Sequence, residues 1–201
     1  MYKTHATRVQ AYAQQSPDNL ARTIAFVMTT IRSPIERAPV EVAEIDALGD
    51  AAPSLWGGKR KGYRYTQEHK AQLFTDCMAC HANGDDVGLL KILVAVPMLG
   101  LPKAGFVAQL AFGRVGCLDT HNLNRYDLKA AAFATSGLKT DGEALDRKCR
   151  LYLATCEQLG GCEQLWNTWC DYVAAQYPNK FADGDVVSAI HCVALTLPTE
   201  A

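Results

Sequence analysis

The sequence predicts an all-α fold in one domain that spans residues 1–201, and three observations support that prediction. Apolar residues recur at helical spacing along most of the chain, whereas no convincing alternation of the strand type occurs. Proline, aspartate and glycine stand where helices are expected to begin and end. The chain is 49% hydrophobic, which is enough apolar surface for one sizeable core.

The first half of the chain contains two helix signals. Ser16-Pro17-Asp18 combines a capping hydroxyl, a proline for the first turn and an acid, so a helix is expected to begin here. That helix carries four apolar residues on one face: Leu20, Ile24, Val27 and Ile31. Pro34 and Pro39 are expected to interrupt the pattern around the mildly acidic segment Glu36–Asp50. A second helix is expected to open at Thr66.

Further helices are expected in the second half, separated by short turns. Asp85-Asp86 precede the apolar helix Val87–Val96, and a tight connection, Pro97–Gly100, leads to a helix that runs from Pro102 to Phe112. Thr140-Asp141-Gly142-Glu143 has the reciprocal capping spacing that begins a helix, and Gly160-Gly161 separates that helix from the next. A last helix is expected over Val186–Leu195.

Charge and hydropathy narrow the classes of function. The net charge of −1 gives no general attraction to nucleic acid, so any polyanion site must come from local clustering. The longest apolar run, Leu89–Leu101, is interrupted by Lys91 and Pro97 and is too short to span a bilayer. The N-terminal residues lack the apolar core of a signal peptide. We therefore expect a cytoplasmic protein with no membrane partner and with mostly reduced thiols.

Residues 96–125 form the most informative unit, in which a helix, a glycine-containing turn and a second helix lead through a short loop to Asp119. Gly100 is expected to take a positive φ and to let a phosphate approach the backbone, because it has no Cβ. The N–H groups at the start of the following helix would point at that phosphate. Such a hairpin binds the DNA backbone without reading base sequence.

This unit resembles the helix-hairpin-helix DNA glycosylase superfamily, which has a Leu-Pro-Gly-Val-Gly turn, an Ala-Phe-Gly-like helix end and a Val-Asp-Thr-His segment with the catalytic aspartate. The matching segments are Val96-Pro97-Met98-Leu99-Gly100, Ala111-Phe112-Gly113 and Leu118-Asp119-Thr120-His121. The resemblance implies a fold of two helical lobes around a DNA cleft. Met98 replaces the first hairpin glycine. Pro102 stands where lyase-type members have their lysine, and Lys103 is rotated from it by roughly 100°, which disfavours a Schiff-base lyase.

A closer resemblance is to a phage-encoded branch, the α-glutamyl/putrescinyl-thymine pyrophosphorylases or amino acid:DNA transferases. It rests on three segments: Lys103-Ala104-Gly105-Phe106-Val107, Val115-Gly116-Cys117-Leu118-Asp119-Thr120-His121-Asn122 and Asp185-Val186-Val187-Ser188-Ala189-Ile190-His191. It implies a double-stranded DNA substrate with a modified thymine, 5-pyrophosphoryloxymethyluracil, in the bacterial host cytoplasm. An amino acid or related amine would displace pyrophosphate. Whether a divalent metal assists stays open, and no cofactor is certain.

The two resemblances assign roles to particular residues. The catalytic candidates are Asp119, Lys103, His121 and His191. The DNA-binding candidates are Met98, Leu99, Gly100, Lys103 and Arg125. The segment Trp56–Tyr65 has four cations, no acids and three aromatics, and is expected to be a glycine-rich loop. Its cations are the candidates for binding pyrophosphate: Lys59, Arg60, Lys61 and Arg64.

Each assignment has a structural alternative. Asp119 also fits the N-cap of a following helix, and the two roles are compatible. The cations of residues 59–64 fit a solvated surface run. His121 and His191 fit structural histidines, although Ser188 precedes His191 by one helical turn and the pair fits a polar patch at the site.

The cysteine spacing argues against a metal or haem centre. Cys77-Met78-Ala79-Cys80-His81 matches a haem-attachment pattern, but no export signal accompanies it and the second pair of a zinc site is missing. Cys149, Cys156, Cys162 and Cys170 are separated by six, five and seven residues, whereas the iron–sulfur pattern of some glycosylases has six, two and five. We expect no iron–sulfur cluster and buried thiols instead.

Three functions remain from the sequence: the amine transferase, a monofunctional base-excision glycosylase in which Asp119 stabilises a cationic sugar and activates water, and a DNA-binding module without catalysis.

Overall fold

The computed structural model describes residues 2–176, so the helix expected over Val186–Leu195, together with His191, lies outside the described residues. The described part contains nine α-helices, three short 3-10 helices and no strand, which confirms the all-α prediction. The α-helices are α1 (Tyr2–Ala13), α2 (Pro17–Thr29), α3 (Ala38–Leu48), α4 (Gly58–Asn83), α5 (Asp86–Val94), α6 (Leu101–Phe112), α7 (Thr120–Arg125), α8 (Glu143–Gln158) and α9 (Gly161–Gln176).

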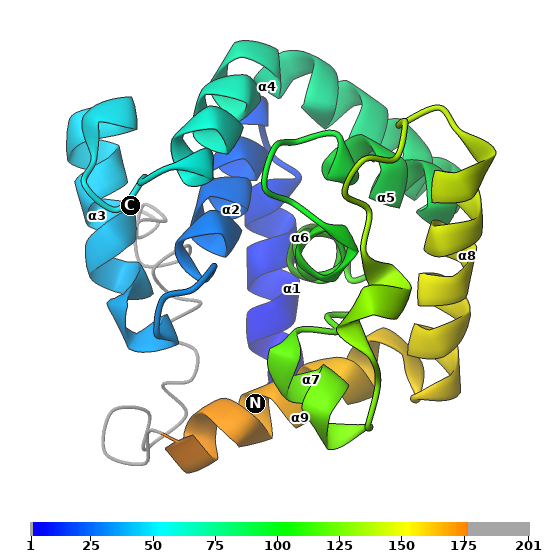
Figure 1. Cartoon of the computed structure of the whole chain (residues 1–201). Helices are drawn as coiled ribbons and strands as arrows, with labels where there is room; N and C mark the ends of the chain where they lie inside the picture. The colour runs from blue at the N-terminus through cyan, green and yellow to red at the C-terminus, as the bar shows by residue number, and fades with distance from the viewer. Residues whose placement is uncertain (1, 177–201) are drawn as a thin grey trace.

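Helix α6 is the centre of the fold. Figure 1 shows it end-on in the middle of the bundle, and it packs against α1, α2 and α5. Its residues from Ala104 to Phe112 are all buried. The hairpin before it and the Asp119 loop after it are therefore both attached to a buried helix. Of the helices in residues 2–176, none has the length and apolar character needed to cross a bilayer.

Local capping explains why several helix starts were predictable. The Ser16 hydroxyl accepts a hydrogen bond from the Asn19 N–H (3.2 Å), and Asp85 Oδ1 accepts one from the Gly88 N–H (2.8 Å). Helix α8 follows the Thr140–Glu143 signal, but it begins at Glu143 and not directly after Thr140. The reciprocal capping predicted there is wrong, because the N-cap is Gly142 and forms no side-chain bond.

Helix α4 begins at Gly58, eight residues before the predicted start at Thr66, and this corrects the expectation of a loop over Trp56–Tyr65. The glycines that favour a loop in the sequence have a packing role in the helix. A Cβ on Gly62 would lie 2.3 Å from the Pro97 carbonyl oxygen, and one on Gly58 would lie 2.3 Å from Met98 Sδ. The two glycines thus let α4 approach the 97–100 hairpin closely.

Helix α3 was not predicted. Pro39 lies in its first turn, where a missing N–H costs nothing, so this proline begins a helix instead of interrupting one. The α3 helix forms the outer layer beside α2 (Figure 1).

Candidate functional site

A cavity of about 270 Å³ brings together three of the four catalytic candidates. Asp119, Lys103 and His121 all line it, although they come from the loop before α7, from the first turn of α6 and from α7 itself. The other lining residues come from the end of α2 and the segment after it, from α6 and from α9: Thr30, Ser33, Pro34, Ile35, Phe106, Trp169 and Tyr172.

Asp119 is both a helix cap and a cavity residue. Its Oδ1 accepts hydrogen bonds from the N–H groups of His121 and Asn122, each at 3.1 Å, so it is the N-cap of α7. The side chain is half-buried and lines the cavity. The capping alternative is therefore correct, and it leaves the catalytic role possible because a capped carboxylate is held in one place.

The segment before Asp119 is fixed by Tyr152 of α8, which sequence reasoning missed. The fully buried Tyr152 hydroxyl donates to the Gly116 carbonyl (2.8 Å) and accepts from the Leu118 N–H (2.9 Å). Burial raises the pKa of Tyr152 well above its usual value, so the phenol keeps the proton that it donates. A Cβ on Gly105 would lie 2.4 Å from this hydroxyl oxygen, so only glycine permits the contact. No signal in the sequence links residue 152 to residue 119.

The segment before Asp119 is also held by a hydrogen bond from Asn122, and it begins at a strained residue, Val115. Asn122 Nδ2 donates to the Cys117 carbonyl (2.6 Å) and is buried. Val115 has φ +66°, which is an uncommon conformation for a β-branched residue. Strain of this kind persists only where the surrounding structure holds it, and it is frequent next to functional sites.

Lys103 forms the cationic wall of the cavity. It is half-buried, its Nζ donates to Thr30 Oγ1 (2.9 Å), and it lies 5.6 Å from the centre of the Phe106 ring. The rotation between positions 102 and 103 does not take the lysine out of the cavity of Asp119. A protonated amine and a carboxylate are thus available to one bound molecule.

The cavity is also lined by aromatic rings. His121 stacks on Tyr172 with ring centres 3.6 Å apart, and Phe106 packs against Trp169 with ring centres 5.3 Å apart. The cavity therefore combines polar groups with flat ring surfaces on which a planar molecule can stack.

Lys59 is placed differently from the expectation and is no longer a candidate for pyrophosphate. It is fully buried, its Nζ donates to the Thr29 carbonyl (3.2 Å), and it lies 3.9 Å from Glu41 Oε2. The other oxygen of Glu41, Oε1, accepts from the Ser33 hydroxyl (2.6 Å). Burial lowers the pKa of Lys59, against the opposing attraction of Glu41. The pair supports the segment between α2 and α3 that lines the cavity.

The remaining cations of this segment lie on α4 and do not line the Asp119 cavity. Arg60 is half-buried and Lys61 is exposed. Arg64 is exposed and pairs with Asp50 at 2.7 Å. They lie on the helix whose Gly58 and Gly62 pack against the hairpin, and none of them is brought to Asp119.

The hairpin has its positive φ at Met98 (+76°) and not at Gly100, whose φ is −76°, and this corrects the expectation for Gly100. Met98 is 42% exposed. Gly100 is the N-cap of α6, and Leu99 is buried beneath the turn. Arg125 is exposed at the end of α7, outside the cavity.

No group of three or more metal-ligating side chains gathers within residues 2–176. The seven cysteines described there are free thiols. Burial raises the pKa of Cys149 and Cys162 to about 11 and that of Cys156 and Cys170 to about 12, so these side chains are neutral at pH 7.

The candidate site is thus built from the end of α2 and the segment after it, from α6, from Asp119 and His121, and from α9.

Compared with protein-family models, curated proteins and solved structures, the chain gives no match in any of the three.

Proposed function

We propose that the chain is a DNA base-modifying enzyme with a helix-hairpin-helix glycosylase-like fold and that the Asp119 cavity is its active site. In this proposal it transfers an amino acid or related amine to 5-pyrophosphoryloxymethyluracil in double-stranded phage DNA and releases pyrophosphate. The observation that carries the proposal is the meeting of Asp119, Lys103 and His121 in one cavity, since these are three of the residues to which the resemblance assigns catalytic roles.

The geometry supports a substitution at the methylene carbon of the base. An extruded base would enter the cavity and stack on the aromatic wall formed by His121 and Tyr172. The amine nitrogen forms a bond to the methylene carbon, the carbon–oxygen bond breaks, and its electron pair leaves with pyrophosphate. Asp119 takes the surplus proton from the nitrogen as a general base. The Lys103 ammonium offsets negative charge that develops on the departing oxygen.

The hairpin and the exposed cations are assigned to the DNA. Met98 and Gly100 would face a backbone phosphate at the start of α6, where the helix dipole favours an anion. Lys61 is exposed on α4 next to Gly62, which packs against the hairpin, so it is better placed to contact a DNA phosphate than pyrophosphate at Asp119. Arg64 lies on another face of α4 and pairs with Asp50.

The test is an incubation of the protein with DNA that contains 5-pyrophosphoryloxymethyluracil and a pool of amino acids, followed by mass spectrometry of the nucleosides. We expect an amine-bearing thymidine that is absent with Asp119→Asn. Asp127→Asn is the matched control, because Asp127 is an exposed carboxylate close by in sequence that does not line the cavity. If DNA incubated with the unsubstituted protein still contains only the unchanged pyrophosphorylated nucleoside, the proposal is wrong.

Base excision by a monofunctional glycosylase is the second candidate, and the position of Asp119 in the cavity favours keeping it. In this reading the carboxylate stabilises a cationic sugar and activates water. The same assay separates the two, because excision gives abasic sites instead of a new nucleoside. Borohydride added during the reaction would trap the protein on DNA only if Lys103 forms an imine with the sugar. A DNA-binding module without catalysis would bind the DNA and give neither product.

A further inference from the structure

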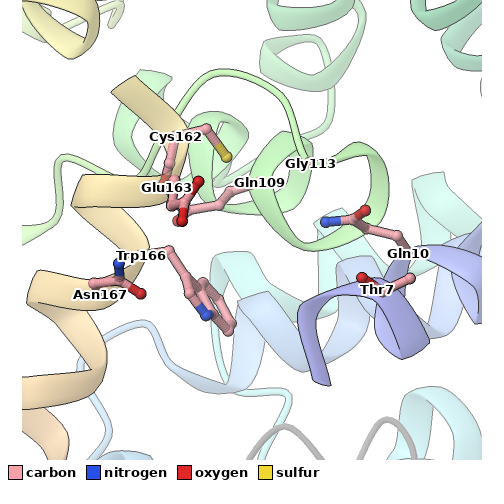
Figure 2. Close-up of a pocket in the computed structure, with 8 residues that line it drawn as sticks. All are labelled: Thr7, Gln10, Gln109, Gly113, Cys162, Glu163, Trp166 and Asn167. Carbon is pink, nitrogen blue, oxygen red and sulfur yellow. The ribbon is translucent and has the colours of Figure 1, made fainter. Parts of the chain in front are cut away.

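Trp56 is a large aromatic residue that the structure leaves at the surface, just before α4. It is 47% exposed, whereas the other two tryptophans, Trp166 and Trp169, are 5% and 4% exposed. Trp166 lines a cavity of about 340 Å³ beside α1 and α6 (Figure 2), and Trp169 lines the Asp119 cavity. A single exposed apolar side chain is common in folded proteins, so what matters at Trp56 is how its ring is held.

The Trp56 ring lies over a buried cation. Lys59 Nζ is 5.1 Å from the centre of the ring, on one of its faces. Lys59 is fully buried, so this face of the ring is covered. The exposed surface of Trp56 therefore belongs to the opposite face and to the ring edges. The residue presents a flat aromatic surface to solvent.

The backbone around Trp56 is fixed on both sides. The preceding residue, Leu55, is fully buried in a small core with Ile45 and Ala52. The Trp56 carbonyl accepts a hydrogen bond from the Lys59 N–H (3.2 Å), which closes the turn into α4. Because the residue is already held in place, little conformational entropy is lost when a ligand stacks on its ring.

The charges near the ring narrow the kind of ligand. A second cation on the outer face would be repelled by the Lys59 ammonium on the inner face, so the ring is a poor site for amines and methylated amines. A neutral planar ring can stack there. Lys61, in the first turn of α4, is exposed, and residues 56–65 include no acid. An aromatic face followed by an exposed cation is the combination with which proteins hold unpaired nucleotides.

We propose that the outer face of Trp56 binds a nucleobase of an unpaired DNA strand and that Lys61 contacts a phosphate of the same strand. Neither residue lines the Asp119 cavity, so this contact is separate from the base that reacts there. Only the choice of DNA over RNA rests on the proposed function. The stacking is expected with unmodified DNA, so it holds or fails independently of amine transfer.

The test follows tryptophan fluorescence during titration with an oligothymidylate of about eight nucleotides. An abasic oligomer of the same length is the matched ligand, because it keeps the phosphates and lacks the bases. We expect saturable quenching by the oligothymidylate and about tenfold weaker binding of the abasic oligomer, since stacking of one base contributes on this scale. Equal affinity for the two oligomers, or no quenching by either, would overturn the proposal.

Two further ligands separate the alternatives. Oligouridylate of the same length tests RNA, and tighter binding of it than of oligothymidylate would overturn the assignment to DNA. Tetramethylammonium tests recognition of a methylated lysine on a protein partner. We expect it to leave the fluorescence unchanged, and a saturable change would mean that the ring binds cations instead of bases.

Variants are compared through the fluorescence anisotropy of a labelled oligothymidylate. We expect Trp56→Leu to weaken binding by about tenfold and Trp56→Phe, which keeps a flat ring, to weaken it much less. Leu151→Ala is the matched control, because it removes a side chain of similar exposure (48%) on α8 and should leave the affinity unchanged. Lys61→Met should lower the slope of log affinity against log salt by about 0.7. Unchanged affinity of Trp56→Leu would contradict the proposal, and the abasic oligomer tests it without any variant.

Discussion

The Asp119 loop and the first turns of α4 both carry charged side chains, and the structure places those charges in opposite environments. Asp119 caps a helix with one oxygen and still lines a cavity. Lys59 has no surface at all, and its ammonium is satisfied by the Thr29 carbonyl and by Glu41. A structural role therefore does not remove Asp119 from the candidate site, whereas it does remove Lys59.

The two regions are also held in place by different kinds of interaction. The Asp119 loop is held by neutral hydrogen bonds from Tyr152 and Asn122, which fix its backbone and leave the cavity open. The α4 segment is held by a buried ion pair, which contributes to the position of Ser33 at the cavity edge but presents no charge there. Substitution of Asp119 is expected to change chemistry more than stability, and substitution of Lys59 to do the reverse.

The largest expected effect is that of Asp119→Asn on turnover. We expect a loss of about 10²–10⁴-fold in the rate of transfer, the usual contribution of a positioned general base. The unfolding free energy should change by less than about 1 kcal/mol, because asparagine is as good an N-cap as aspartate. Rates from the nucleoside assay and urea unfolding curves give the two numbers. Transfer that survives this substitution would show that Asp119 is only a cap.

Lys59→Met should reverse that pattern. Removing the ammonium leaves the buried Glu41 with only the exposed Arg37 (3.7 Å) as a charge partner, so we expect a loss of up to about 3–5 kcal/mol in unfolding free energy. Lys61→Met, two residues along and exposed, should stay within about 0.5 kcal/mol. Adding Glu41→Gln to Lys59→Met should recover part of the loss. Loss of transfer by a Lys59→Met protein of unchanged stability would restore the pyrophosphate assignment.

The sequence predicts a helix start when the interaction that sets it lies within a few residues, and it misses a start that is set by a distant contact. The caps at Ser16 and Asp85 are bonds across three residues, so the residue types alone predict them. The start of α4 was missed because Gly58 and Gly62 favour a loop locally, and only their contact with the hairpin, more than thirty residues away, explains them.

The site shows the same division. Asp119, Lys103 and His121 belong to one short unit whose order of parts is visible in the sequence. Tyr152, Trp169 and Tyr172 reach the loop or the cavity from α8 and α9, and their spacing from Asp119 carries no periodic signal. Tertiary packing alone brings them there, so the aromatic wall and the loop support were outside the reach of pattern-based inference.

Tyr152→Phe tests the neutral support of the Asp119 loop. It leaves the buried Leu118 N–H without its bond and the Gly116 carbonyl with only the weak bond from the Cys156 thiol (3.8 Å), so we expect a loss of about 2–4 kcal/mol in unfolding free energy. Transfer by the remaining folded protein should also fall, because the loop is no longer pinned. Tyr126→Phe is the matched control, since it loses one partly buried bond to Thr168 Oγ1 (3.3 Å). Equal losses of unfolding free energy in the two variants would show that the Tyr152 hydroxyl stabilises the loop no more than a single partly buried bond does.

The smallest expected effect separates the hairpin backbone from the Met98 side chain. Met98 has φ +76°, a conformation that glycine adopts freely and that other residues adopt at a cost. Met98→Gly and Met98→Ala both remove a side chain that is 42% exposed, but only glycine removes the strain. We therefore expect Met98→Gly to be more stable than Met98→Ala by about 1 kcal/mol in urea unfolding, the scale of strain at such a residue. The reverse order would mean that position 98 does not need the left-handed conformation. The backbone of this turn would then no longer support its likeness to a glycine-containing DNA hairpin.

The affinity of the same two variants for duplex DNA tests whether the turn contacts phosphate through its backbone. If it does, both variants should keep that affinity, because backbone contacts persist when the Met98 side chain is removed.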